Sequence, residues 1–133
     1  MNKIFSILIA AIVFMGINAH SKADELSTTW RVNDELLVVA GCIKYEDILE
    51  VAQLGIENDD EAMLLWSTKL EEDKCRIFPF PFPGKLVAWK IGPITMSSEP
   101  AYKGSIWEVA VYETTIHLLL PDDSGPHGIK DSI

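Results

Sequence analysis

Histidine and cysteine, the side chains that most often hold metals or act as nucleophiles, are scarce in this chain of 133 residues. There are three histidines and two cysteines. Cys42, Cys75, His117 and His127 lie far apart in the sequence, and their spacing matches no zinc site. The G-x-S-x-G, H-E-x-x-H, P-loop and G-x-G-x-x-G motifs are also missing. The sequence therefore predicts no metal and no cofactor, and it favours a binding protein over an enzyme.

Basic residues are the second scarcity. The chain has 11 Lys and Arg against 20 Asp and Glu, a formal net charge of −9. Binding to nucleic acid or to an anionic membrane surface requires clustered Lys and Arg side chains, so both partners are disfavoured. An acidic protein instead attracts a basic protein partner by electrostatic steering. The simpler interpretation is that the acidity only keeps an exported protein soluble.

Residues 1–23 have the pattern of a secretory signal peptide. Lys3 precedes an apolar run over residues 4–17, which is 14 residues long. A membrane-spanning helix needs about 20 apolar residues, so the run is too short to span. Small residues offer a cleavage site after Ala23, or alternatively after Ala19. Cleavage after Ala23 removes two lysines and no acid, which changes the net charge from −9 to −11.

This pattern predicts a bacterial protein that is periplasmic or secreted. If the segment is not cleaved, it instead tethers the protein to the membrane, and this is the only case in which we expect a membrane partner. The rest of the chain is long enough for one domain, which we expect over residues 24–121. The polar residues 122–133, with two Gly and one Pro, are expected to form a flexible tail.

The two cysteines, Cys42 and Cys75, predict a disulfide bond, because an exported protein meets an oxidising compartment. The bond closes a loop of about 33 residues, for which the chain-entropy estimate of the stabilisation is about 3.5–4 kcal/mol. The spacing is not C-x-x-C, which argues against a thioredoxin-like redox role.

Between the cysteines, two apolar stripes at helical spacing predict a helical hairpin. The first helix covers residues 45–54 and is expected to end at Gly55. The second begins at Asn58, which forms a capping-box-like pair with Glu61. Its inward stripe consists of Ala62, Leu65, Trp66, Lys69 and Leu70, with the Lys69 stem at the edge. The disulfide would then clamp both ends of this hairpin.

Strands are expected on both sides of the helices. Residues 36–41 (LLVVAG) fit a fully buried strand, and residues 85–91 fit a strand that Gly92-Pro93 ends. The clearest strands cover 105–112 and 115–120. A turn at residues 113–114 would set Val111 opposite Ile116, Val109 opposite Leu118 and Trp107 opposite Leu120, which makes one face wholly apolar.

His117 is the first of two candidate sites. In the register above, it shares a mixed face with Glu108 and Tyr112, and a histidine beside a carboxylate is able to act as a general base. These three residues are the weak catalytic candidates. The alternative interpretation is an ordinary surface histidine on a strand.

The segment Phe78-Pro79-Phe80-Pro81-Phe82-Pro83 is the second candidate site. Proline supplies no ladder N–H, so the segment is not a central strand. If it is extended, Phe78, Phe80 and Phe82 share one side and form an aromatic ridge for a partner protein. The alternative is that these phenylalanines fill the core, because three exposed rings would be a costly apolar patch.

The sequence thus predicts an α+β fold: a helical hairpin stapled by Cys42–Cys75, followed by a small antiparallel sheet or partly open barrel. Trp66, Trp89 and Trp107 are expected in the core. The predicted function is a binding or inhibitor-type module of the cell envelope. The alternatives are a small envelope hydrolase that uses His117 and Glu108, and a membrane-tethered or phage-encoded accessory factor.

Overall fold

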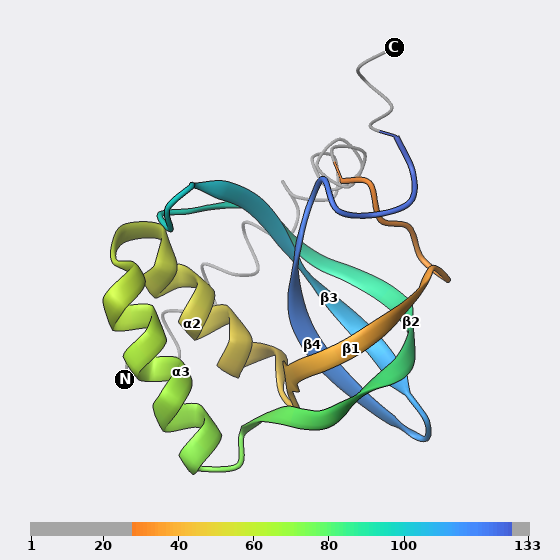
Figure 1. Ribbon diagram of the computed structural model, residues 1–133, viewed down its shortest axis with the longest axis horizontal. Helices are drawn as coiled ribbons and strands as arrows, with labels where there is room; N and C mark the ends of the chain where they lie inside the picture. Colours follow the sequence, from red (N-terminus) through yellow and green to blue (C-terminus); the bar gives the residue numbers. More distant parts are fainter. Residues whose placement is uncertain (1–27, 129–133) are drawn as a thin grey trace, which may run out of the picture.

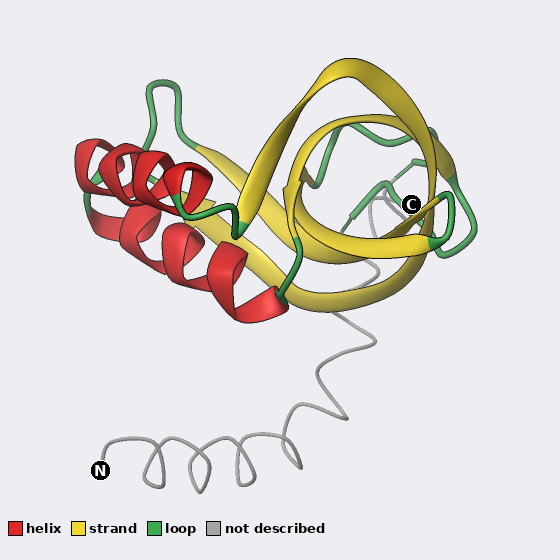
Figure 2. Cartoon of the chain, turned by 90° about the horizontal axis from the view of Figure 1, so that it is seen from below, coloured by secondary structure: helices red, strands yellow, loops and turns green. Residues whose placement is uncertain are grey.

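The computed structural model describes residues 28–128, so the predicted signal peptide lies outside the described residues. The elements, in chain order, are β1 (Glu35–Cys42), α2 (Tyr45–Glu57), α3 (Asp59–Glu71), β2 (Cys75–Met96), β3 (Tyr102–Val111) and β4 (Thr114–Pro121). The four strands are antiparallel and close into a ring in the order β1-β2-β3-β4. The two helices lie side by side against one side of this ring (Figures 1 and 2).

The α+β class is confirmed, but the predicted order of its parts is wrong. The helices do not precede the sheet. They are inserted between β1 and β2, and the predicted antiparallel sheet is a ring of four strands that includes β1. The disulfide between Cys42 and Cys75 exists, and its two residues are directly opposite each other in the β1–β2 ladder. It therefore joins two strands at the point where the helical insertion leaves and returns, rather than joining the helices.

The core has two parts, one on each side of the strands. The ring interior holds Trp107, which is fully buried, with Val38, Leu86, Val109, Val111, Ile116 and Leu118 around it; Trp30 and Trp89 pack against this cluster. The second part lies under the helices and contains the disulfide with Ile48, Ala52, Ile94, Met96 and Ile106; Trp66 packs against it.

β1 is a strand as predicted, but it is not buried on both faces. Val38 is 1% exposed, whereas Leu37 and Val39 are 68% and 57% exposed. Side chains along a strand alternate between its faces, so only every second residue of β1 reaches the ring interior. The continuous apolar run hides this alternation, because its outward positions are also aliphatic.

The capping of α3 is confirmed and the predicted end of α2 is wrong. The side chain of Asn58 accepts a hydrogen bond from the Glu61 N–H at 3.1 Å. Helix α2, however, continues past Gly55 to Glu57. Gly55 is buried there, and an added Cβ atom would collide with the methyl carbon of Met96. This glycine allows close packing of α2 on β2 rather than ending the helix.

The strands β3 and β4 are paired two residues away from the predicted register. Val109 lies opposite Ile116, Trp107 opposite Leu118 and Val111 opposite Thr114. The turn consists of Tyr112 and Glu113 rather than residues 113–114, and Tyr112 has a φ of 56°. A shift of two residues keeps every side chain on its predicted face, so the apolar pattern alone could not distinguish the two registers.

The strand β2 is 22 residues long and continues through Gly92-Pro93, where its register with β3 shifts. Its first half pairs with β1 alone, because the pairing with β3 begins at Lys85. The ladder to β1 is interrupted over residues 78–81, which lie opposite Val39 alone. Prolines 79 and 81 lack the N–H that a ladder needs, which explains this bulge and agrees with the prediction that the segment is not a central strand.

Residues 122–127, the first part of the predicted tail, contact the segment 28–34. The backbone N–H and the hydroxyl of Thr29 donate to the carbonyl oxygen of Asp122 at 2.6 and 2.7 Å. The N–H of Gly125 donates to the hydroxyl of Thr29, and the His127 ring lies 2.9 Å from Asp34. These contacts join the residues that follow β4 to the segment that precedes β1.

Candidate functional site

The acidic residues of the described chain are concentrated on the helices. Residues 45–73, which contain α2 and α3, carry ten Asp and Glu against one Lys. Residues 28–44 and 74–128 together carry seven acids and seven bases, and are neutral. Nine of the ten helical carboxylates are exposed: Glu46, Glu50, Glu57, Asp59, Asp60, Glu61, Glu71, Glu72 and Asp73. We refer to these nine side chains as the acidic helical face.

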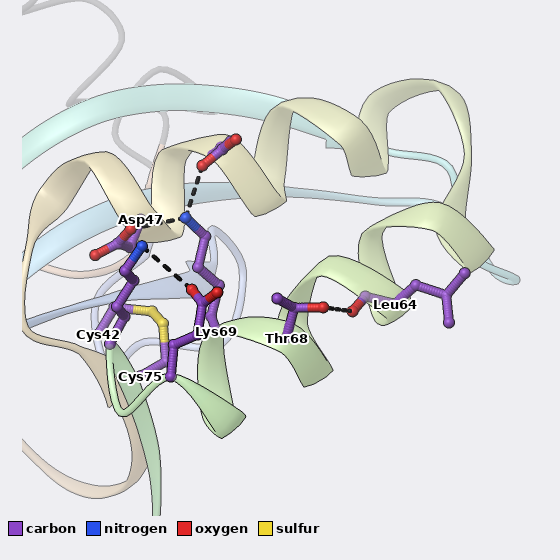
Figure 3. A network of polar contacts seen from close by, with 9 residues as sticks. Cys42, Asp47, Leu64, Thr68, Lys69 and Cys75 are labelled. Carbon is purple, nitrogen blue, oxygen red and sulfur yellow. Dashed lines mark hydrogen bonds and ion pairs between the residues drawn. A yellow bond between two sulfur atoms is a disulfide. The ribbon is translucent and has the colours of Figure 1, made fainter.

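The tenth carboxylate and the only lysine of this segment neutralise each other inside the helix pair. Lys69 on α3 places its Nζ atom 2.8 Å from Oδ1 of Asp47 and 2.7 Å from Oε1 of Glu50, both on α2 (Figure 3). The side chains of Lys69 and Asp47 are only 7% and 12% exposed. Hydrogen bonds to Asp47 and Glu50 raise the pKa of Lys69 above its ordinary value of 10.5. Lys69 therefore holds α2 and α3 together and offers no positive charge to a partner.

A polar groove of about 490 Å³ runs between the two helices on the acidic helical face. It is lined by Glu50, Gln53, Leu54, Glu57, Asn58 and Glu61. The acids at the start of α3 also suit the positive end of the helix dipole, which accounts for part of the cluster. The carboxylates of Glu57 and Glu61 remain exposed on either side of the helix–helix connection.

The structure places His117 and Glu108 directly opposite each other on β4 and β3. In the described residues, however, no hydrogen bond joins them. The His117 Nδ1 atom lies 3.2 Å from the carbonyl oxygen of Ile43, and the Glu108 carboxylate lies 3.8 Å from Lys90. The contact through Nδ1 orients the His117 ring, and the Glu108 carboxylate takes no part in that contact. The catalytic role of these residues stays a prediction.

Tyr112, the third catalytic candidate, lies elsewhere. It is in the β3–β4 turn, 75% exposed, with its ring 5.6 Å from that of Phe82. The aromatic neighbour of His117 is instead Tyr45, whose ring centre is 6.1 Å away, and Lys90 lies over the Tyr45 ring at 5.5 Å. Burial and the nearby Glu46 raise the pKa of Tyr45. These neighbours come from α2 and β2, so no pattern local to β3 and β4 could have identified them.

The three phenylalanines of the Phe-Pro segment do not form one ridge. Phe78 and Phe82 pack against the ring interior with their ring centres 5.1 Å apart. Phe80 is 70% exposed at the bulge between them. The structure thus matches the core-filling interpretation for two of the rings, and it leaves Phe80 as the accessible interaction candidate.

Among residues 28–128, no group of three or more His, Cys, Asp and Glu side chains is arranged to hold a metal ion. Neither helix in this range has the length and the apolar character needed to cross a membrane.

Comparison of the chain with models of protein families, with curated proteins and with solved structures finds no match in any of the three. The functional argument therefore depends on the charges and contacts described above.

Proposed function

We propose that this protein is an exported binding module that captures a basic protein partner through the acidic helical face. The observation that carries the proposal is the separation of charge: the helical segment has a net charge of −9, and the rest of the described chain is neutral. Solubility alone requires no particular placement of the charges, and the helix dipole accounts only for the acids at the start of α3. A one-sided negative field both steers a cationic protein and orients it on arrival.

The experiment that tests this proposal compares two variants that lose the same number of charges. The first replaces three carboxylates of the acidic helical face: Glu57→Gln, Glu61→Gln and Glu71→Gln. The second replaces three exposed carboxylates of the remaining chain: Glu99→Gln, Glu113→Gln and Asp123→Asn. Binding of oligolysine is measured for both variants and for the natural protein.

We expect the helical variant to lose affinity for oligolysine by about tenfold or more, a change of about 1.4 kcal/mol, while the control variant changes little. Raising the salt from about 0.01 M to about 1 M shortens the Debye length from about 30 Å to about 3 Å, and should abolish binding of the natural protein. Equal losses in the two variants, or binding that does not respond to salt, would contradict the proposal.

Export is the other part of the proposal, and it is tested by the intact mass of the protein recovered from the producing cell. A mass that starts at Asp24, with cysteines that react with an alkylating agent only after reduction, would support export. The alternative start at His20 would support it equally. A full-length mass would contradict it, and would favour the membrane-tethered alternative.

A further inference from the structure

The ring of strands is closed by a single residue pair. β1 and β4 pair only at Cys42 and His117, whereas the β3–β4 ladder comprises eight residue pairs. From that point the two strands diverge. Within the described chain, residues 35–41 of β1 are paired on one edge only, with β2, and residues 118–121 of β4 only with β3. Two strand edges with free backbone N–H and C=O groups therefore face each other.

An apolar groove of about 250 Å³ lies between these two edges. It is lined by residues 36–41 of β1, residues 118–120 of β4, and the side chains of Ile48 and Trp66 from the helices. None of the lining residues is charged. We refer to this groove as the β1–β4 seam.

A ligand of the seam must form hydrogen bonds with the backbone N–H and C=O groups of the two strand edges, and it must also fill the apolar groove. A purely apolar ligand would cover the N–H and C=O groups of the two strands without bonding to them, at a cost for each group. An extended polypeptide segment supplies both the backbone partners and alternating apolar side chains, which is the recognition mode of β-strand addition.

The charges around the seam complement a basic segment. Glu35 comes directly before the lining residues of β1, and Asp123 follows those of β4 shortly after Pro121; both are exposed. Ile48 and Trp66 belong to the helices that carry the acidic helical face. The seam is thus flanked in the chain by the exposed carboxylates of Glu35 and Asp123, and two of its lining residues come from the acidic helices.

We infer that the β1–β4 seam binds an extended segment of the basic partner, with alternating apolar residues between lysines or arginines, as an added strand. This inference rests on the proposed function, because it names the part of the partner that the acidic helical face attracts. Since β1 and β4 are antiparallel, the added strand runs antiparallel to one of them and parallel to the other.

The test uses a synthetic peptide, KKVTVTVKK, and amide hydrogen exchange of the natural protein. The control is the same peptide with every backbone amide N-methylated, which keeps the charges and side chains but removes the N–H groups from both edges of an added strand. We expect only the unmethylated peptide to slow exchange in residues 36–41 and 118–120, and to bind about tenfold or more tightly than the control peptide.

The possible failures are distinguishable. If both peptides bind equally and exchange in the seam is unchanged, strand addition is wrong and the charge-based function survives. If neither the peptides nor oligolysine binds, the proposed function is wrong and the inference falls with it.

A matched pair of variants provides a second test. Ala40→Trp places an indole in the seam, whereas Ala110→Trp places one at a similarly half-buried strand position on the β2–β3–β4 side of the ring. We expect only Ala40→Trp to weaken KKVTVTVKK binding, and equal affinity of the two variants would overturn the inference. If Ala40→Trp does not fold, the exchange experiment on the natural protein decides the question.

Discussion

The ammonium of Lys69 on α3 lies 2.8 Å from the carboxylate of Asp47 on α2, and both side chains are almost fully buried. Removal of one member of a buried ion pair leaves the other charge without a partner, which typically costs about 3–5 kcal/mol. We therefore expect Lys69→Met to destabilise the protein by an amount of this order in urea unfolding. Lys74→Met is the control, because the exposed pair between Lys74 and Glu72 is worth at most about 1 kcal/mol.

The pKa of Lys69 predicts how this stabilisation depends on pH. Because the folded-state pKa is above the ordinary 10.5, the contribution is fully present below pH 10.5 and is lost as the pH rises through the folded-state value. The unfolding free energy of the natural protein should thus fall more steeply above pH 10.5 than that of Lys69→Met. If the unfolding free energies of the two proteins fall in parallel above pH 10.5, the ionisation of Lys69 does not contribute to stability as predicted.

The buried carboxylate of Asp122 is expected to destabilise the folded protein at neutral pH, in contrast to the buried ammonium of Lys69. Its Oδ1 atom accepts a hydrogen bond from Ser105 at 2.7 Å, whereas Oδ2 is buried and has no partner among the described residues. Burial raises the pKa of Asp122 above its ordinary 3.8, despite the opposing hydrogen bond from Ser105. A raised carboxyl pKa means that folding favours the protonated form, so the associated stability is present below pH 3.8 and is lost as the pH rises through the folded-state value.

Asp122→Asn should consequently raise the melting temperature at neutral pH, because a neutral amide is less costly to bury than a carboxylate. The advantage should shrink as the pH falls through the raised folded-state pKa of Asp122, and it should be gone below pH 3.8. Thermal melts over this pH range test the prediction, with the exposed neighbour changed by Asp123→Asn as the control. A lower melting temperature of Asp122→Asn at neutral pH would show that the charge itself is needed.

The length of the loop that the disulfide closes predicts how much the bond stabilises the protein. It closes a loop of 33 residues, for which the chain-entropy relation gives about 3.5–4 kcal/mol. The double variant Cys42→Ala/Cys75→Ala should lose about this much unfolding free energy. A loss below about 1 kcal/mol would mean that β1 and β2 remain aligned in the unfolded chain without the bond.

Phe82 and Phe80 should respond differently to truncation. Phe82 packs against the ring interior, so Phe82→Ala should lower the free energy of unfolding by more than about 1 kcal/mol. The loss should be smaller than for a fully buried phenylalanine, which typically costs about 3–5 kcal/mol. Phe80 is 70% exposed, and Phe80→Ala should change stability by less than about 0.5 kcal/mol. Urea unfolding of both variants provides the comparison. Equal costs would place Phe80 in the core.

Local patterns predicted the elements better than their arrangement. Apolar stripes and the Asn58 cap predicted both helices, and alternation predicted the faces of β3 and β4. The closure of β1 on β4 joins Cys42 to His117, and no local signal specifies a contact over that distance in sequence. The pairing of β1 with β2, which makes the disulfide a link between two strands, was missed for the same reason.

The predicted site differed from the structure where burial decided the role of a residue. Lys69 falls on the apolar stripe of α3, and its position next to Asp47 depends on how α2 packs, which the sequence does not show. The acidic helical face, by contrast, leaves a clear signal. Ten acids and one base within residues 45–73 become conspicuous once both helices are assigned.

The most direct test of the account is a nuclear magnetic resonance titration of the isotopically labelled protein with oligolysine, in which backbone shifts are followed residue by residue. The account predicts that the largest shifts fall on α2 and α3, around Glu57, Glu61 and Glu71, and that they disappear at high salt. Shifts of similar size around Glu99, Glu113 and the other carboxylates outside the helices would contradict it.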